Sequence, residues 1–356
     1  MTFDVAITAD FYHADGQPKY NDFGLDVFEQ SSQINHRPFT SHESKIAPQQ
    51  LQGVNGVLVL TPRVDIESLA DAGELLIVSR FGVGYDSVDV DACTERDVLV
   101  TITTGAVDRP VAEATIAWML ALNHNVMQKD RLVRAGQWDA RSGFMGSELR
   151  GKTLGIVGLG GIGQQLVALI RGFGMAQPLA CDPYAPDSVF AELGVRRVEL
   201  DELLEDSDFV SLHCPLTDGT KDLIAARELE LMKPTAFLLN LARGGVVDED
   251  ALFYALSNDL IAGAALDCFE TEPVTEPHRL GELDNVILAP HSIAWTNELF
   301  RDIGRMACQS IVDVASGKRP YGVVNPDVLE KPSFFEKWHR IIEQKYFDYK
   351  APLCIK

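Results

Sequence analysis

Gly158-Leu159-Gly160-Gly161-Ile162-Gly163 is the stretch that decides the predicted fold of this chain. It follows a short apolar run, Leu154 to Val157, and opens a segment with helical periodicity. In such a strand–turn–helix unit, Gly158 allows a tight turn, Gly160 lets a ligand approach the backbone without meeting a Cβ, and Gly163 lets the helix pack closely on the strand. Because the N-terminus of the helix then faces an anion, the stretch predicts a turn that binds the pyrophosphate of a dinucleotide.

An acidic residue downstream indicates which dinucleotide binds. Asp182 follows Gly163 by 19 residues, at the end of the apolar run Leu179 to Cys181. A carboxylate in this place accepts hydrogen bonds from a ribose diol and repels a 2′-phosphate. The sequence therefore predicts NAD as the coenzyme and disfavours NADP. A glycine-rich turn without a ligand is the alternative, which the strand, the helix and the acid together make a poor fit.

The residues around this turn alternate between strand-like and helical stretches. Such alternation predicts an α/β fold with a doubly wound parallel sheet of the Rossmann type. The predicted strands are residues 153–157, 179–182, 209–213, 236–240, 262–267 and 286–289.

The chain has 356 residues, which predicts two domains. We expect residues 1–103 to begin a smaller, discontinuous, flavodoxin-like α/β substrate domain, and residues 104–296 to form the NAD-binding domain. Residues 297–356, with a helix to about residue 316, should return to the first domain and add a C-terminal extension. The cleft between the domains is the expected ligand site.

Two further segments have helical patterns. Asp108-Arg109-Pro110 precedes the apolar residues 111–122, which predicts a helix that lies in the core or against another subunit, and so allows a homodimer. In the tail, aromatic and aliphatic residues near helical spacing predict an amphipathic helix on the protein's own surface, with a subunit contact as the alternative. These tail residues are Phe334, Trp338, Ile341, Ile342 and Tyr346.

Composition excludes several classes of protein. The chain has 31 Lys and Arg against 52 Asp and Glu, and its net charge of −21 would repel a nucleic-acid backbone. Its apolar runs are shorter than a membrane span, and its N-terminus lacks the features of a signal peptide, so we expect a cytoplasmic protein. The six cysteines form no C-x-x-C pair, which argues against a zinc site and against a disulfide framework.

Three residues after predicted strands suit hydride-transfer chemistry. Arg243 can grip a carboxylate through two hydrogen bonds, and His291 is the best acid/base candidate of eight histidines. Glu272 could pair with His291 and favour its protonated form. Taken singly, each has a structural alternative: an exposed arginine, a structural histidine and an ordinary Glu-Pro loop.

Several motifs in order resemble the D-isomer-specific 2-hydroxyacid dehydrogenase family, including its glyoxylate/hydroxypyruvate reductases and phosphoglycerate dehydrogenases. The resemblance spans about residues 50–325. The motifs are residues 81–89, 158–163 with Asp182, 213–217, 240–248, 266–273 and 290–296.

The resemblance implies roles for individual residues. Arg243 would bind the substrate's carboxylate and carbonyl oxygen, His291 would be the acid/base and Glu272 its partner. The backbone N–H groups of Val83 and Gly84 would hold the carboxylate. The expected coenzyme-binding residues are Gly158, Gly160, Gly161, Ile162, Gly163, Asp182, His213, Pro215, Thr220, Ala242 and Asp267, the last contacting the nicotinamide amide.

The implied reaction moves a hydride between nicotinamide C4 and C2 of a small 2-keto or 2-hydroxy acid, without a metal. Trp295 resembles the subgroup that acts on glyoxylate and hydroxypyruvate, where it could wall the substrate pocket, although it could equally be a packing aromatic. Formate dehydrogenase fits less well, because related formate enzymes have Gln where this chain has Glu272. A different class remains open: an NADH-sensing, corepressor-like binding protein of the same fold.

Overall fold

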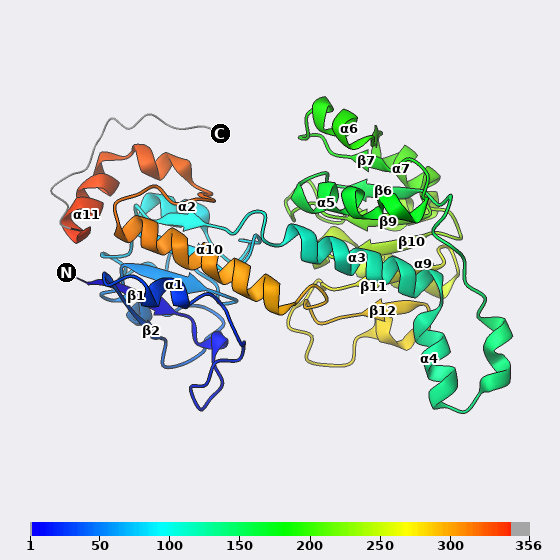
Figure 1. Cartoon of the computed structure of the whole chain (residues 1–356), viewed down its shortest axis with the longest axis horizontal. Coiled ribbons are helices and arrows are strands. Elements are labelled where there is room, and N and C mark those ends of the chain that lie inside the picture. The colour runs from blue at the N-terminus through cyan, green and yellow to red at the C-terminus, as the bar shows by residue number, and fades with distance from the viewer. Residues whose placement is uncertain (1, 343–356) are drawn as a thin grey trace. The chain divides into compact units, whose positions relative to one another are not determined.

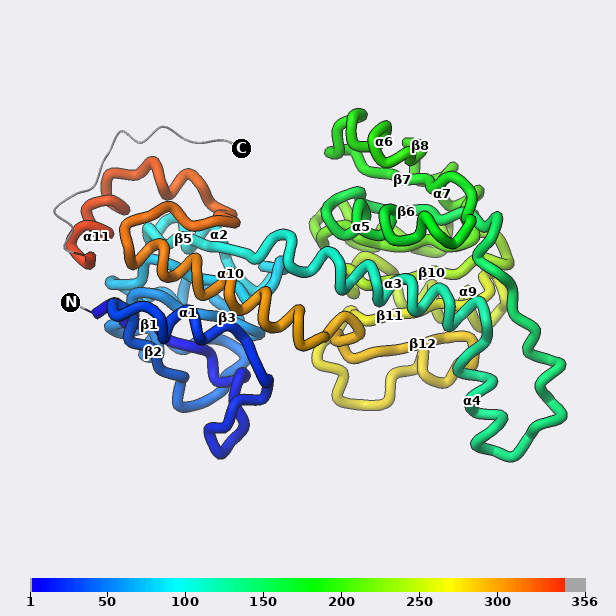
Figure 2. The backbone as a smooth tube through the Cα atoms, viewed as in Figure 1, coloured from blue at the N-terminus to red at the C-terminus, as the bar shows by residue number. Residues whose placement is uncertain are grey.

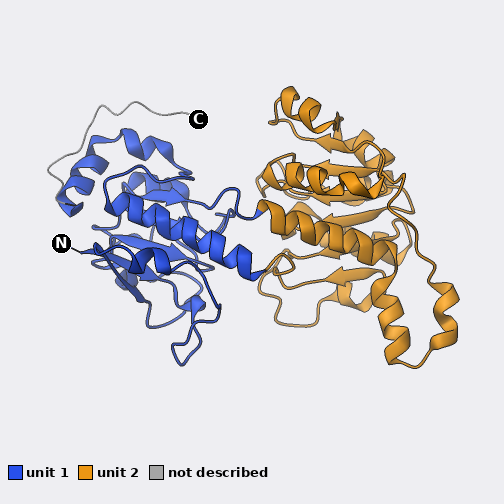
Figure 3. Ribbon diagram, viewed as in Figure 1, with its two compact units in different colours: residues 1–107, 296–356 blue, residues 108–295 orange. Residues whose placement is uncertain are grey.

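A computed structural model of the chain describes residues 2–342. The chain divides into two compact units, which Figure 3 shows in separate colours. Unit 1 comprises residues 1–107 and 296–356, and unit 2 comprises residues 108–295. The division thus falls at 107/108 and 295/296, where the sequence predicted 103/104 and 296/297.

Unit 2 contains a seven-stranded parallel sheet with the order β12-β11-β10-β9-β6-β7-β8 (Figure 1). Counted from β6, this is the doubly wound Rossmann order with one added strand, which confirms the predicted fold class. The strands are β6 (Leu154–Val157), β7 (Leu179–Cys181), β8 (Arg196–Arg197), β9 (Phe209–Leu212), β10 (Phe237–Asn240), β11 (Gly263–Leu266) and β12 (Val286–Leu288). Most of their residues are buried, as a sheet covered on both faces requires.

Helices connect these strands and cover the sheet. The α-helices are α3 (Asp108–Asn123), α4 (Val126–Arg134), α5 (Gly161–Ile170), α6 (Asp187–Leu193), α7 (Leu200–Asp206), α8 (Ala226–Leu231) and α9 (Glu249–Ser257). Short 3-10 turns are η3 (Trp138–Gly143), η4 (Arg171–Phe173), η5 (Gly244–Val246) and η6 (Arg279–Glu282). Helix α3 packs along α5 and buries Trp118 and Met119, so its apolar face belongs largely to the core of unit 2.

Unit 1 contains a five-stranded parallel sheet with the order β2-β1-β3-β4-β5, which is the flavodoxin-like order. The strands are β1 (Phe3–Ile7), β2 (Ile34–Pro38), β3 (Gly56–Val59), β4 (Ile77–Arg80) and β5 (Leu99–Thr101). The other elements are α1 (Asp26–Glu29), α2 (Val90–Glu95), α10 (Asn297–Ala315), α11 (Pro332–Ile342), η1 (Ala9–Phe11), η2 (Pro48–Leu51) and η7 (Pro326–Glu330). The second, discontinuous α/β domain is therefore present.

The C-terminal part of the chain completes unit 1. Figure 2 shows α10, in orange, beside α1 and β3, and α10 also contacts β4. Ser79 Oγ on β4 donates a hydrogen bond of 2.9 Å to the Ala307 carbonyl of α10. In α11, Phe334 and Trp338 are buried, and Trp338 Nε1 donates to the Val314 carbonyl at 2.7 Å. The predicted docking of a tail helix on the protein's own surface is thus confirmed, while Tyr346 lies outside the described residues.

Three features are described for residues 2–342: helix hydropathy, the state of the cysteines and groups of possible metal ligands. No helix in this range combines the length and the apolar character needed to span a bilayer. The cysteines described there, Cys93, Cys181, Cys214, Cys268 and Cys308, are free thiols. The same range holds no group of three or more His, Cys, Asp or Glu side chains placed to hold a metal ion.

Candidate active site

The glycine turn between β6 and α5 has the geometry that its sequence predicts. Gly158 has a φ of 94°, and a Cβ placed there would lie 2.9 Å from backbone atoms of His213 and Cys214. A Cβ on Gly163 would lie 2.6 Å from the Gly158 carbonyl oxygen, which shows the close packing of helix on turn. A Cβ on Gly160 would meet nothing within 4 Å. The backbone at Gly160 is therefore open to a ligand.

The first turn of α5 offers donors for an anion. Across residues 2–342 the N–H groups of Gly161, Ile162 and Gly163 have no hydrogen-bond partner, and the first paired donor is Gln164 N, at 2.9 Å from the Gly160 carbonyl. Unpaired N–H groups at a helix N-terminus favour a phosphate both by hydrogen bonding and through the helix dipole. The turn therefore fits the pyrophosphate of NAD.

Asp182 lies at the end of β7 and braces this turn. Its Oδ2 accepts a hydrogen bond from Leu159 N at 2.7 Å, and its Oδ1 accepts from Tyr184 N at 2.8 Å and Ala185 N at 3.0 Å. A carboxylate has about four acceptor positions, so one remains for a ribose hydroxyl. The side chain thus has a structural role that the sequence did not indicate, beside the predicted contact with the ribose.

The segment after β9 also borders the turn. The His213 ring bonds through Nε2 to Ser211 Oγ at 2.8 Å, while its buried Nδ1 has no partner within the described chain. Burial lowers the pKa of His213 to about 4, so the ring is neutral at pH 7. Thr220 Oγ1 donates to the Pro215 carbonyl at 2.6 Å and accepts from Thr217 N at 2.8 Å, which holds the following loop in shape.

The predicted pair of Glu272 and His291 is a direct contact. Glu272 Oε2 lies 2.8 Å from His291 Nδ1, and Glu272 Oε1 accepts from Phe269 N at 2.9 Å. Partial burial acts to raise the pKa of Glu272, but the hydrogen bond and charge of His291, the Phe269 N–H and the charge of Arg243 outweigh it and lower the pKa. The His291 side chain is 48% exposed, so a substrate can reach it.

Asp267 fixes the loop that carries His291. Its Oδ1 accepts from Ser292 N at 2.8 Å and from Ile293 N at 3.1 Å. Burial raises the pKa of Asp267 to about 6, although these two N–H groups and the nearby His291 act to lower it. The end of β11 is therefore tied directly to the segment that follows β12.

Arg243 follows β10 on a tightly held loop. Its Nη1 donates to the Ala242 carbonyl at 2.7 Å, and Asn240 Nδ2 donates to the Arg243 carbonyl at 2.8 Å. A Cβ on Gly244 would lie 1.9 Å from the Phe269 carbonyl, so this loop packs directly on the loop that carries Glu272. Unit 2 thus brings Arg243, Glu272 and His291 to one end of its sheet.

A clamp of three residues, Glu249, Glu270 and His278, holds the Glu272 loop and was not predicted. Glu249 N donates to Glu270 Oε1 at 3.0 Å, and Glu270 N donates to Glu249 Oε1 at 2.8 Å. His278 Nε2 lies 3.0 Å from Glu249 Oε2. The acidic start of α9 was visible in the sequence, but nothing in its spacing indicated a contact about twenty residues away.

The remaining predicted residues lie elsewhere. Val83 and Gly84 are on a loop after β4 in unit 1, where Arg80 Nε donates to the Gly84 carbonyl at 3.0 Å. The N–H groups of Val83 and Gly84 have no partner in the described part of the chain. Trp295, at the end of unit 2, is 49% exposed.

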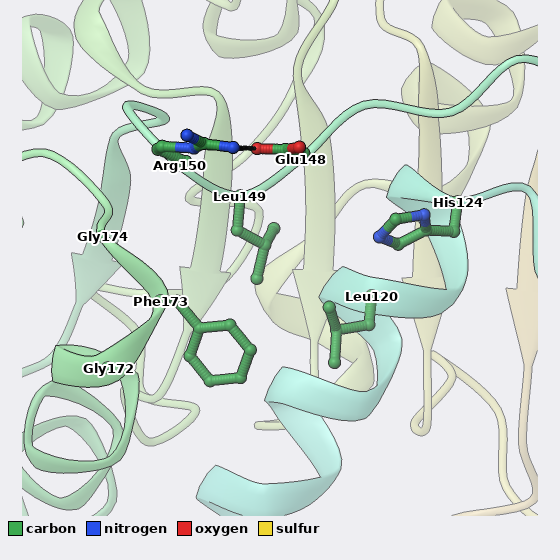
Figure 4. A pocket seen from close by; sticks show the side chains of 8 residues that line it. All are labelled: Leu120, His124, Glu148, Leu149, Arg150, Gly172, Phe173 and Gly174. Atoms are coloured by element: carbon green, nitrogen blue, oxygen red, sulfur yellow. Dashed lines mark hydrogen bonds and ion pairs between the residues drawn. The ribbon is translucent and has the colours of Figure 1, made fainter.

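A separate cavity of about 460 Å³ lies in unit 2 (Figure 4). Its lining comes from the end of α3, the segment before β6 and η4, and includes Leu120, His124 and Phe173. The Arg150 side chain in its wall is paired with Glu148, with Nε 2.8 Å from Oε2. None of the predicted site residues lines this cavity.

The Rossmann sheet and the glycine turn define a dinucleotide-binding protein, and the comparisons specify its family. Residues 116–292 match the family model for the NAD-binding domain of D-isomer specific 2-hydroxyacid dehydrogenases. The chain is 40% identical to a glyoxylate reductase from Thermococcus litoralis over 279 residues, which are 77% of this chain and 84% of that protein. It is 41% identical to a glyoxylate reductase from Aeropyrum pernix over 284 residues, which are 78% and 84% of the two chains.

A solved structure of a dehydrogenase has a similar fold. A D-lactate dehydrogenase from Aquifex aeolicus, in complex with NAD and lactic acid, matches with a TM-score of 0.75 and 27% identity, over 88% of this chain and 96% of that one. The chain therefore belongs to the D-isomer specific 2-hydroxyacid dehydrogenase family. It is an NAD-dependent dehydrogenase of this class.

Proposed function

We propose that this chain reduces a small 2-keto acid to the D-2-hydroxy acid, with His291 as acid/base, Glu272 as its partner and Arg243 as the carboxylate clamp. The observation that supports this most strongly is the 2.8 Å contact between His291 and Glu272, on a loop packed against the loop of Arg243. Such a set supplies a proton and a fixed cation beside one another, as reduction of a keto acid requires.

The His291 ring transfers the proton. Because its Nδ1 is engaged by Glu272, its Nε2 is the nitrogen that holds a proton for the substrate oxygen. The lowered pKa of Glu272 keeps that carboxylate ionised, so it stabilises the charged imidazole and fixes its orientation. The Arg243 guanidinium binds the substrate's carboxylate and polarises its carbonyl oxygen.

The reduced coenzyme, NADH, supplies the hydride to C2 when it is bound. We assign its pyrophosphate to the turn at residues 158–163 and its ribose to Asp182, with further contacts from His213, Pro215, Thr220 and Ala242. Asp267 would hold the nicotinamide amide. The backbone N–H groups of Val83 and Gly84 would add to the grip on the carboxylate, and Trp295 would wall the substrate pocket.

Glyoxylate is the first substrate to test, because two relatives at about 40% identity are glyoxylate reductases. The expected homodimer and cytoplasmic location remain predictions.

The test is NADH oxidation with a panel of 2-keto acids: glyoxylate, hydroxypyruvate, pyruvate and a branched 2-keto acid. We expect kcat/KM to be largest for glyoxylate or hydroxypyruvate. Arg243→Lys should retain part of the activity, since it keeps the charge but loses the two-pronged geometry, and Arg243→Ala should lose about 10²-fold or more. Equal rates for wild type and Arg243→Ala with every acid would contradict the proposal.

The second candidate function is an NADH-sensing binding protein. It is favoured only if NADH changes the association of the chain with a partner while none of the panel is reduced. The same preparation can be examined for both readouts, so the two functions are distinguishable.

A further inference from the structure

Asp108 lies against the first residue of α5. It is the first residue of α3, which packs along α5 in unit 2 (Figure 1). A Cβ placed on Gly161 would lie 2.1 Å from Asp108 Oδ2 and 2.5 Å from its Cγ. The Asp108 carboxylate thus lies directly against Gly161 and would have to move to admit a side chain there, whereas a Cβ at the neighbouring Gly160 would meet open space.

This carboxylate lies at the start of two helices and has no partner of its own within residues 2–342. Two helices, α3 and α5, begin beside it, and helix N-termini attract negative charge. Its side chain makes no hydrogen bond to any of residues 2–342, and its partial burial raises the pKa of the carboxyl. The N-terminus of α5 carries the unpaired N–H groups of residues 161–163. An ionised Asp108 therefore places a negative charge, without a hydrogen-bond partner in the described chain, beside these groups.

We propose that Asp108 opposes the coenzyme's pyrophosphate at the N-terminus of α5 and so sets the affinity for NAD below what the glycine turn alone would give. This inference rests on the proposed placement of the coenzyme in that turn. Like charges a few ångström apart in a partly buried site repel strongly enough to change a dissociation constant by about tenfold. A weaker hold on the coenzyme favours its release after each turnover.

A different role for Asp108 makes the opposite prediction. If the carboxylate accepted a hydrogen bond from a ribose hydroxyl of the coenzyme, removal of its charge would weaken binding. If it served only to stabilise the starts of α3 and α5, its replacement would lower the melting temperature and leave the dissociation constant unchanged.

The test is calorimetric titration of NADH into the full chain, with wild type, Asp108→Asn and Asp108→Ser. Asp139→Asn, which removes a fully exposed carboxylate on η3, is the matched charge control. We expect Asp108→Asn to bind NADH about tenfold more tightly than wild type and Asp139→Asn to bind like wild type. The advantage of Asp108→Asn should shrink as NaCl is raised, because salt screens the repulsion.

The NADH titrations distinguish failure of this inference from failure of the proposed function. Unchanged or weaker binding of NADH by a folded Asp108→Asn or Asp108→Ser protein would overturn the inference and leave the coenzyme site intact. Failure of wild type to bind NADH would instead overturn the proposed function. Thermal melts of all variants show whether they are folded. If Asp108→Asn does not fold, the titration of Asp108→Ser tests the inference.

Discussion

Both sheets of this molecule are parallel, but they differ in the residues that follow the strands where the strand order reverses. In each, the strand order reverses beside the first strand of the sheet: between β1 and β3 in unit 1, and between β6 and β9 in unit 2. Ligands of open α/β sheets bind outside the carboxyl ends of strands at such reversals. We expect the reversal in unit 2 to bind the coenzyme and the reversal in unit 1 to be closed to it, because different residues occupy the two places.

In unit 1 the chain's own side chains fill the reversal. Thr8 Oγ1 accepts from Leu60 N at 3.2 Å, and Asp10 Oδ2 accepts from Thr61 N at 2.8 Å. The Phe11 side chain is fully buried directly after them. In unit 2, glycines occupy the equivalent turn and leave its N–H groups unpaired. Architecture alone thus does not define function; the residues of one turn do.

The largest expected effect separates chemistry from coenzyme binding within unit 2. Replacing His291 by Ala removes the proton donor and should lower kcat for keto-acid reduction by about 10²- to 10⁴-fold. The dissociation constant for NADH should change little, since the ring is not part of the glycine turn. Steady-state kinetics and calorimetry on the same protein check both statements, and an active His291→Ala enzyme would contradict the assigned role.

The next effect concerns the open turn itself. Gly160→Ala adds a Cβ that meets no protein atom within 4 Å, so stability should be unchanged while NADH binds about 10- to 100-fold more weakly. Gly158→Ala is the contrasting control: its φ of 94° and its 2.9 Å approach to His213 should destabilise the fold. Tight NADH binding by Gly160→Ala would show that the ligand does not approach this backbone.

At the reversal in unit 1, a substitution should lower stability and leave the affinity for NADH unchanged, the opposite of the result expected for Gly160→Ala. Asp10→Ala leaves Thr61 without its buried acceptor and should lower the free energy of unfolding by about 1 to 3 kcal/mol. Its affinity for NADH should stay within about twofold of wild type. Urea unfolding and NADH titration test the pair of statements. A large loss of NADH affinity in a folded Asp10→Ala protein would break the distinction between the two turns.

The smallest effect is a pH dependence of stability from Asp267. Because the folded-state pKa of Asp267 is raised to about 6, above its ordinary value, the ionised carboxyl costs stability above pH 6, and this cost is absent below about pH 4. Asp267→Asn keeps an acceptor for Ser292 N and Ile293 N without the charge. It should be more stable than wild type by about 1 to 2 kcal/mol at pH 8 and by nearly nothing at pH 4.

Asp65 in unit 1 provides the control of opposite sign. Its backbone hydrogen bond from Ser68 and its contact with Lys45 lower its pKa. Its ionised form therefore stabilises the fold above its ordinary pKa, and this contribution is lost on acidification. Asp65→Asn should lose stability at pH 8 and much less at pH 3. Urea unfolding across this pH range tests both variants; equal shifts for both would contradict the assignment.

Much of unit 2 could be predicted because its signals are local. The glycine turn, Asp182 and the apolar strands all depend on short-range spacing, and the structure places them as expected. The two-residue strand β8 was missed because Arg196 and Arg197 are exposed and too few to form a pattern. The edge strand β2 was missed for a similar reason, since its residues are mostly polar and only partly buried.

The contacts that complete the site could not be predicted, because they join residues distant in the sequence. Glu249 contacts the loop at Glu270, and Asp108 meets Gly161 only after α3 packs on α5. No periodicity encodes such pairs. The sequence indicated the reacting residues, whereas the contacts of Glu249 with Glu270 and of Asp108 with Gly161 are seen only in the structure.

Amide hydrogen exchange with and without NADH tests the central claim most directly, that the coenzyme occupies the open reversal of unit 2. We predict slower exchange on binding at the N–H groups of Gly161, Ile162 and Gly163, and no change at Asp10 and Phe11 in unit 1. Slowed exchange at the reversal of unit 1, or none at residues 161–163 under saturating NADH, would contradict it.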